Sequence, residues 1–180
     1  AQIRCVVWSG DQHRIPAPPD DGMQVVLFGH MTVYTARTDL QLKVTRIEAE
    51  GDGLRRKAIE LTLAKLRLEG LLDESRKRAI PHFPRMVAVV TSPDGAALRD
   101  IVAVLRKRNG GARVVLCPAK VQGDRAALEI VAALRRVARW GKADVVIVGR
   151  GGGGKEDLSA FNDERVARAV AACPVPGISA

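Results

Sequence analysis

The sequence predicts an α/β protein, in which a parallel, doubly wound, Rossmann-like sheet domain follows a small β domain. From residue 86 onward, short apolar segments alternate with helix-patterned segments, which is typical of a parallel sheet with helical crossovers. Residues 1 to 50 instead hold β-branched segments separated by turn residues. The composition is 47% hydrophobic but only 3% aromatic, so the core must be aliphatic, as it is in parallel sheets.

The first domain is predicted at residues 1–50. Strands are expected in 3–8, 23–34 and 40–49, separated by the turn signals "SGDQ", "PPDDG" and "ARTD". Alternation in "LQLKVTRI" is regular until Ile47, where it breaks. Three strands with open edges make a poor independent domain, and this half resembles the later strands of an OB-type barrel. We therefore predict a partial OB-fold domain.

A basic helix and linker are predicted at residues 51–85. The pattern of 54–72 indicates a helix with one apolar stripe, formed by Leu54, Ala58, Leu61, Leu68 and Leu72. Across 54–85, nine Lys/Arg stand against four Asp/Glu. The charge is more than a solvated face needs, and it favours a polyanionic partner.

The α/β domain is predicted at residues 86–180 and is expected to be truncated at its C-terminal end. Strands are expected in 86–92, 112–119, 144–149 and from 175, with helices in 96–108, 124–140 and 160–173. Sheets of this kind bind ligands outside the carboxyl ends of their strands. Two loops, "TSPDGAALRD" and "GRGGGGKED", are predicted to lie at that edge.

The glycine loop is the strongest candidate for a phosphate site. Backbone amides of Gly151, Gly152 and Gly153 could approach a phosphate, and Arg150 could clamp it. The other loop, formed by Thr91, Ser92, Asp94 and Gly95, could offer hydroxyls and amides to an anion, and Ser92 and Gly95 are singled out. The loop matches neither a dinucleotide fingerprint opening a helix nor a Walker loop.

The acidic residues near these loops leave several roles open. Glu156 and Asp157 could hold a metal ion, orient Arg150 or favour the start of the next helix, and the neutral Asn162 could reach the loop or a metal ion there. Asp100, early in its helix and off the apolar stripe, could equally be a partner of the helix dipole. The three histidines, His13, His30 and His82, lie outside the α/β half and are expected at the surface.

Charge and cysteine content indicate the partner and the compartment. The net charge of +9 favours a polyanion. Cys5, Cys117 and Cys173 are widely spaced and read as buried hydrophobes in a reducing compartment. Because no apolar run approaches the length of about 20 residues that spans a bilayer, the chain is expected to be cytoplasmic. It also looks cut at both ends.

Three long motifs, "FPRMVAVVTSPDGAALRDI", "PAKVQGD" and "DVVIVGRGGGGKEDLSAFNDERVARAV", resemble the family of bacterial exodeoxyribonuclease VII large subunits. The resemblance covers essentially the whole chain and departs from the usual pattern at Gly154 and Lys155. It implies an exonuclease that degrades single-stranded DNA from either end into short oligonucleotides, gripping the strand with its OB domain.

The resemblance also implies site residues and partners. The family's essential Asp and Arg correspond to Asp100 and Arg150. Mg²⁺ is a possible cofactor, and no organic cofactor is expected. A His and a further acid would follow residue 180, so this fragment is predicted to be catalytically incomplete. The small subunit would bind through a C-terminal region that the fragment lacks.

Nucleic-acid binding is predicted on the β domain and the basic helix. Trp8, Phe28 and Tyr34 are the aromatic residues available for stacking, of which Trp8 and Tyr34 are singled out together with Arg55, Arg56 and Lys57. Two alternatives remain: a nucleotide- or dinucleotide-binding Rossmann-like enzyme, and a non-catalytic module that binds single-stranded DNA.

Overall fold

The computed structural model describes residues 2–15, 17–34, 39–49, 53–151 and 155–180. The chain divides into two compact units, Ala1–Lys65 and Leu66–Ala180, which are described separately. None of the helices in the described ranges is long and apolar enough to cross a membrane.

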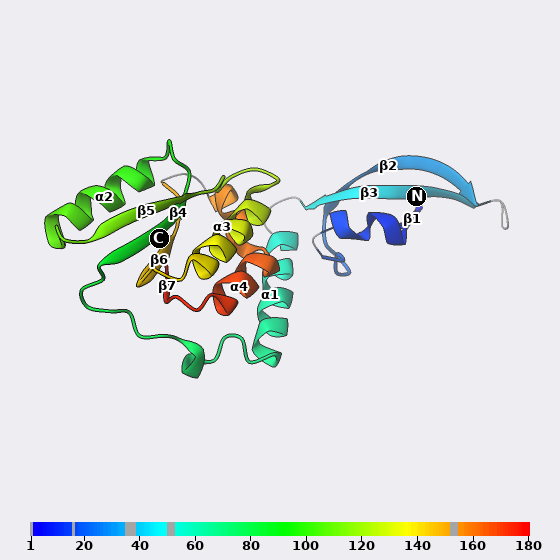
Figure 1. Ribbon diagram of the computed structural model, residues 1–180. Helices are drawn as coiled ribbons and strands as arrows, with labels where there is room; N and C mark the ends of the chain where they lie inside the picture. Colours follow the sequence, from blue (N-terminus) through cyan, green and yellow to red (C-terminus); the bar gives the residue numbers. More distant parts are fainter. Residues whose placement is uncertain (1, 16, 35–38, 50–52, 152–154) are drawn as a thin grey trace. The chain divides into compact units, whose positions relative to one another are not determined.

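The first unit contains a three-stranded sheet (Figure 1). Its strands are β1 (Arg4–Val6), β2 (Val25–Tyr34) and β3 (Asp39–Ala49), and a short 3₁₀ helix η1 (Ser9–Arg14) follows β1. The order is β1-β3-β2, in which β1 runs parallel to β3 and β2 runs antiparallel to it. The three strands expected from the sequence are confirmed.

A β-bulge explains why the alternation of β3 breaks at Ile47. The register between β2 and β3 shifts between Phe28 and Gly29, so that Gly29 pairs with Val44 and Leu27 pairs with Ile47. Val44 and Ile47, three residues apart, are therefore both buried in one apolar cluster. Gly29 is required there because a Cβ on it would overlap the carbonyl oxygen of Lys43.

The helix α1 (Gly53–Leu68) has a different apolar face from the predicted stripe. Leu54 is buried with Val44 and Ile47, as expected. Leu61 and Leu68 are 51% and 90% exposed, however, whereas Leu66 is buried. The predicted stripe is therefore wrong beyond its first turns.

The end of α1 was also predicted too late, at residue 72. Gly70 has a φ of +65°, its N–H donates to the carbonyl of Arg67, and the N–H of Leu71 donates to the carbonyl of Leu66. These two bonds form a Schellman motif, which closes the helix at a left-handed glycine. A short 3₁₀ helix η2 (Glu74–Arg76) follows.

The second unit is the predicted parallel sheet with helices (Figure 1). Its elements are β4 (Met86–Thr91), α2 (Ala96–Arg108), β5 (Arg113–Pro118), α3 (Ala126–Trp140), β6 (Val145–Val148), η3 (Lys155–Asn162), α4 (Glu164–Ala172) and β7 (Gly177–Ser179). The strand order is β5-β4-β6-β7 and every pair is parallel. The α/β fold class is confirmed.

Helices cover both faces of this sheet. Val87 and Val89 of β4 lie in one cluster, against which Leu98 and Ile101 of α2 pack. The alternating residues of β4, Ala88 and Val90, lie in a second cluster with buried residues of α3 and α4. Figure 1 shows α2 on one side of the sheet, with α3 and α4 on the other. The sheet is therefore doubly wound.

The last helix begins later than its sequence pattern predicts. Asn162 ends η3, Asp163 is the N-cap and α4 begins at Glu164, four residues after the predicted start at residue 160. The reason is the carboxylate of Asp163, which accepts a hydrogen bond of 2.8 Å from the N–H of Arg165 and so fixes the start of the helix.

Candidate active site and nucleic-acid interface

The two loops predicted to carry the chemistry leave adjacent strands at the same edge of the sheet. β4 and β6 are neighbours, with Val90 paired to Val148. Beyond this pair, the N–H of Gly149 donates to the carbonyl of Val90 at 3.3 Å. The loop after β4 contains Ser92, which is half-buried, and the loop after β6 contains Arg150.

Gly151 lies against the N-terminus of α2. A Cβ on Gly151 would be 3.3 Å from the nitrogen of Ala97 and 3.6 Å from the Cβ of Ala96. Gly95 is the N-cap of α2 and has no side chain with which to cap the helix. The first-turn amides of α2 therefore lie beside Gly151 without an acceptor from their own N-cap residue, an arrangement that favours an anion.

Asp100 lies one helical turn beyond Ala96 and is exposed. Residues four apart on a helix have Cβ atoms about 6 Å apart, and a Cβ on Gly151 would lie 3.6 Å from that of Ala96. The Cβ of Asp100 and a Cβ on Gly151 would therefore be within roughly 10 Å of each other. The structure thus brings the predicted acid close to Gly151 of the predicted phosphate loop. Asp100 lies off the apolar cluster of this helix, as the sequence predicts.

The backbone of Arg150 is held by the end of the chain's last described strand. Its N–H donates to the carbonyl of Ala180 at 3.3 Å, and the N–H of Ala180 donates to Val148 at 3.1 Å. A Cβ on Gly149 would overlap the carbonyl oxygen of Ala180. This close contact fixes where the half-buried Arg150 leaves the sheet.

Several predicted residues fall outside what the structure describes. Gly152 and Gly153 are not described, nor are the side chains of Glu156 and Asp157. Asn162 is exposed at the end of η3. Within the described ranges, no three His, Cys, Asp or Glu residues are grouped so as to hold a metal ion.

Asp163, next to Asn162, has a defined structural role. Its two carboxylate oxygens accept hydrogen bonds of 2.9 and 2.6 Å from the guanidinium of Arg165. These bonds lower the pKa of Asp163, against the opposing effect of burial. Arg168 of α4 binds Glu164 and also Glu69, which anchors the segment after α1 to α4.

A second candidate surface lies on the sheet of the first unit. The ammonium of Lys43 lies 4.4 Å from the ring centroid of Trp8, and the guanidinium of Arg46 lies 4.1 Å from that of Phe28. Both distances are those of cation–π pairs. Trp8 is 56% exposed and Phe28 is 38% exposed, so each ring keeps accessible surface.

The two cation–π pairs share one face of the sheet. Phe28 pairs with Arg46 and His30 pairs with Lys43, and positions two apart on β2 point to the same side. The pairs are thus separated by about 7 Å along the strand. Lys43 and Arg46 were not singled out from the sequence. A period-2 pattern would identify two cations on one face of a strand, but the bulge separates these two by three residues, so the pattern did not reveal them.

The other predicted nucleic-acid-binding residues differ in their surroundings. Arg55 and Arg56 are exposed on α1. The ammonium of Lys57 instead donates to the carbonyl of Pro18 at 2.9 Å and to the carboxylate of Asp20, so this cation is held within the unit. The side chain of Tyr34 lies outside the described set.

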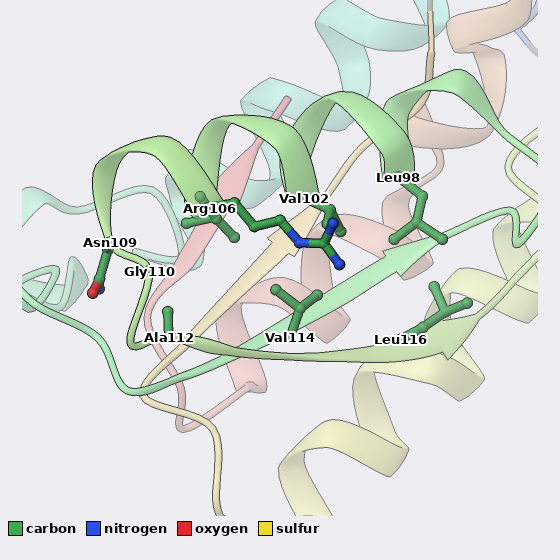
Figure 2. A pocket seen from close by; sticks show the side chains of 9 residues that line it. Leu98, Val102, Arg106, Asn109, Gly110, Ala112, Val114 and Leu116 are labelled. Carbon is green, nitrogen blue, oxygen red and sulfur yellow. The ribbon is translucent and has the colours of Figure 1, made fainter.

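A groove of about 370 Å³ between α2 and the edge strand β5 is separate from these candidate residues. Figure 2 shows Leu98 and Val102 of α2 facing Val114 and Leu116 of β5, with Arg106 as the charged member of the lining. Its lining offers neither a carboxylate nor a histidine for acid–base chemistry.

Comparisons with known proteins identify the family of the chain. Residues 71–180, which contain Asp100, Arg150 and Gly151, match the family model described as exonuclease VII, large subunit. The chain belongs to the exonuclease VII large-subunit family. Residues 1–48, which carry both cation–π pairs, match the OB-fold nucleic acid binding domain model.

Individual members of the exonuclease VII family are similar over the whole of this chain. The exodeoxyribonuclease 7 large subunit of Syntrophotalea carbinolica is 50% identical over 180 residues, which are 45% of its length. That of Moorella thermoacetica is 45% identical, again over 45% of its length. That of Xanthomonas axonopodis pv. citri is 45% identical over 40% of its length. The chain therefore spans less than half of these curated relatives.

Proposed function

We propose that the protein to which this chain belongs hydrolyses phosphodiester bonds of single-stranded DNA, from both ends, to give short oligonucleotides. The observation that carries the proposal is the position of Gly151 on the N-terminus of α2, with Arg150 beside it and Asp100 one turn along the helix. An anion-binding loop, a permanent cation and a carboxylate thus meet at one edge of the sheet.

Each of these groups has a part in the proposed reaction. Arg150 and the α2 amides bind the scissile phosphate and stabilise the charge that develops on it as water attacks the phosphorus. Asp100 orients the attacking water and accepts its proton. The bond from phosphorus to the leaving oxygen breaks, and that oxygen takes a proton to become a hydroxyl.

The proton donor is expected outside this chain. The three histidines of the sequence, His13, His30 and His82, are exposed and lie before β4. A His and an acid from residues beyond 180 would complete the site, so the 180-residue chain alone is proposed to be catalytically incomplete. A small subunit would bind the protein through its C-terminal region.

We also propose Mg²⁺ as a cofactor, although none of the steps described above requires it. Among the described residues, Asp100 offers one carboxylate oxygen ligand of the kind that this ion prefers. An assay in Mg²⁺ and in EDTA tests whether DNA cleavage depends on the ion.

The strand is proposed to bind the first unit through the two cation–π pairs. Trp8 and Phe28 would each stack a base, while Lys43 and Arg46 neutralise neighbouring phosphates. This surface favours a second function for the chain by itself, namely that of a single-stranded DNA binding module.

A cytoplasmic location is proposed because Cys5, Cys117 and Cys173 are free thiols. Of the three, only Cys173 is buried as predicted, whereas Cys117 is half-buried and Cys5 is exposed.

The test uses the full-length parent protein with its small subunit. End-labelled single-stranded and duplex DNA are incubated with the parent, with Asp100→Asn and with Arg150→Ala. Matched controls are Asp124→Asn and Arg139→Ala, which remove the same charges at exposed positions of the second unit. We expect release of oligonucleotides from single strands only, and a loss of about 100-fold or more in the two site variants.

Equal activity in the site variants and in their controls would move the site elsewhere. Tight binding of a nucleotide cofactor without cleavage would favour the Rossmann-like enzyme. Binding of single strands without cleavage by the complete protein would leave only the binding module.

A further inference from the structure

Thr91, the last residue of β4, carries a buried hydroxyl with no visible partner. Its side chain is 1% exposed, and its Oγ1 makes no hydrogen bond in the part of the chain that the structure describes. Its backbone is satisfied, because its carbonyl accepts a bond of 3.1 Å from the N–H of Ala119. A buried polar group without a partner is expected to meet a ligand or an ordered water.

The hydroxyl lies on the α2 side of the sheet, at the end where this helix begins. Residues two apart on a strand face the same way, and Val87 and Val89 pack toward Leu98 and Ile101 of α2. Thr91 continues this row to the carboxyl end of β4. Only the short loop 92–95 then separates it from the start of α2.

Two other features leave the first-turn amides of α2 without a covering side chain from Gly95 or Gly151. Gly95, the N-cap of α2, has no side chain with which to accept from the first-turn amides. Gly151 has no Cβ, which would otherwise cover the nitrogen of Ala97 at 3.3 Å. The helix N-terminus, the glycine and the unpartnered hydroxyl therefore converge from three segments of the chain.

We propose that Thr91 is a phosphate ligand, whose hydroxyl donates to a non-bridging oxygen of a phosphate bound at the first turn of α2, beside Gly151. The proposal rests on the proposed function, because it takes this phosphate to be part of the DNA strand. Thr91 would act in binding, leaving the orientation of water to Asp100. It also explains why a threonine hydroxyl occupies a buried strand end facing an aliphatic cluster.

The test separates the hydroxyl from the rest of the side chain. Thr91→Val replaces the hydroxyl with a methyl group of similar size, whereas Thr91→Ser keeps the hydroxyl and removes the methyl. The ¹⁵N-labelled chain and both variants are titrated with a thymidine dinucleotide bearing a 5′-phosphate, and the amide signals of Ala96, Ala97 and Gly151 are followed. Thymidine, which has no phosphate, is the ligand control.

We expect Thr91→Val to raise the Kd reported by these amides about tenfold or more, since hydrogen bonds to charged groups are the stronger ones. Thr91→Ser should stay within about threefold of the parent. The thermal midpoint of Thr91→Val should be unchanged or higher, because the free protein loses an unsatisfied group.

Two results would overturn the proposal. One is an unchanged Kd in Thr91→Val. The other is a clearly lower thermal midpoint in Thr91→Val than in Thr91→Ser, which would show that the hydroxyl has a partner inside the protein.

Failure of the proposed function has a different signature. If phosphate binding depends on Thr91 but the full-length protein cleaves no DNA, the phosphate site is supported and the proposed nuclease activity is contradicted. If Thr91→Val and the parent cleave DNA with the same KM, the nuclease activity is supported and the role of Thr91 in it is contradicted.

Discussion

Gly151 is so close to Ala97 that a Cβ on the glycine would lie 3.3 Å from the alanine nitrogen. These two residues are 54 positions apart in the sequence, and they follow neighbouring strands, β6 and β4. The contact also places Arg150 beside the helix that carries Asp100. Gly151 therefore packs closely against the N-terminus of α2.

The first prediction concerns this contact. Gly151→Ala in the full-length protein should lower the rate of DNA cleavage about 10- to 100-fold, because the added methyl group covers an amide that stabilises the phosphate. Initial rates on labelled single strands measure the effect. Gly111→Ala is the matched control, since its nearest neighbour, Asn109 Oδ1, is 3.9 Å away. A rate equal to that of the control would contradict an anion site here.

The second prediction concerns the β-bulge. Gly29→Ala should lower the free energy of unfolding of the first unit by about 3 kcal/mol, because the new Cβ meets the backbone of Lys43 rather than a side chain that could move. Urea unfolding followed by the fluorescence of Trp8, in a Trp140→Phe background, measures it. Gly10→Ala, with no atom within 4 Å, should change it little. Similar effects of the two substitutions would show that the bulge can relax.

The third prediction separates stacking from charge on the first unit. Arg46→Gln should reduce the slope of log K against log salt by about 0.7 for a thymidine oligonucleotide, as expected for one phosphate contact on a single strand. Phe28→Ala should weaken binding about tenfold and leave the slope unchanged. Fluorescence anisotropy at several salt concentrations measures both. Arg139→Gln controls for the loss of charge, and an equal change of slope there would place the contact elsewhere.

The fourth prediction concerns pH. The pKa of Asp163 is lowered in the folded protein by Arg165, so the ionised form is stabilising. That contribution is fully present above the ordinary pKa of about 4 and is lost as the pH falls through the lower folded value. At pH 7, Asp163→Ala should cost about 1 kcal/mol of unfolding free energy through the lost cap and ion pair. The difference from the parent should shrink below pH 4.

The measurement is urea unfolding between pH 3 and 7, followed by Trp140 in a Trp8→Phe background. Asp163→Asn is the control, because an amide keeps an acceptor for the Arg165 N–H and has no charge to titrate. Its stability relative to Asp163→Ala should not depend on pH. A constant gap between parent and Asp163→Ala would show that the ion pair contributes nothing.

Sequence patterns predicted the elements of the second unit well and the boundaries of helices less well. In β4, a continuous apolar run could only be a strand buried on both faces, and in α2 the spacing of Leu98, Ile101 and Leu105 gave the inward face. The stripe of α1 failed because leucine occurs on more than one side of that helix, and only packing selects which are buried. Leu68 is 90% exposed whereas Leu66 is buried.

The candidate site divides in the same way. Residue type and position after a strand were enough to select Arg150 and Gly151, since parallel strands present their carboxyl ends at one edge. Asp100 was selected through the family resemblance, because its place early in a helix fits a partner of the helix dipole equally well. Thr91 was only one of several loop residues that could face an anion, and Lys43 and Arg46 were not selected, because the significance of all three depends on neighbours. A buried hydroxyl is notable only when nothing binds it, and a cation on a strand only when an aromatic ring lies beneath it.

Local periodicity, together with glycine and proline, was enough to predict the fold class, the order of strands and helices along the chain and the loops that hold the candidate chemistry. Three features became visible only in the folded chain: the strand order β5-β4-β6-β7, the bulge that turns both Val44 and Ile47 inward, and the contact between Gly151 and Ala97. These depend on pairing between segments far apart in the chain, and local propensity carries no information about which segments will meet.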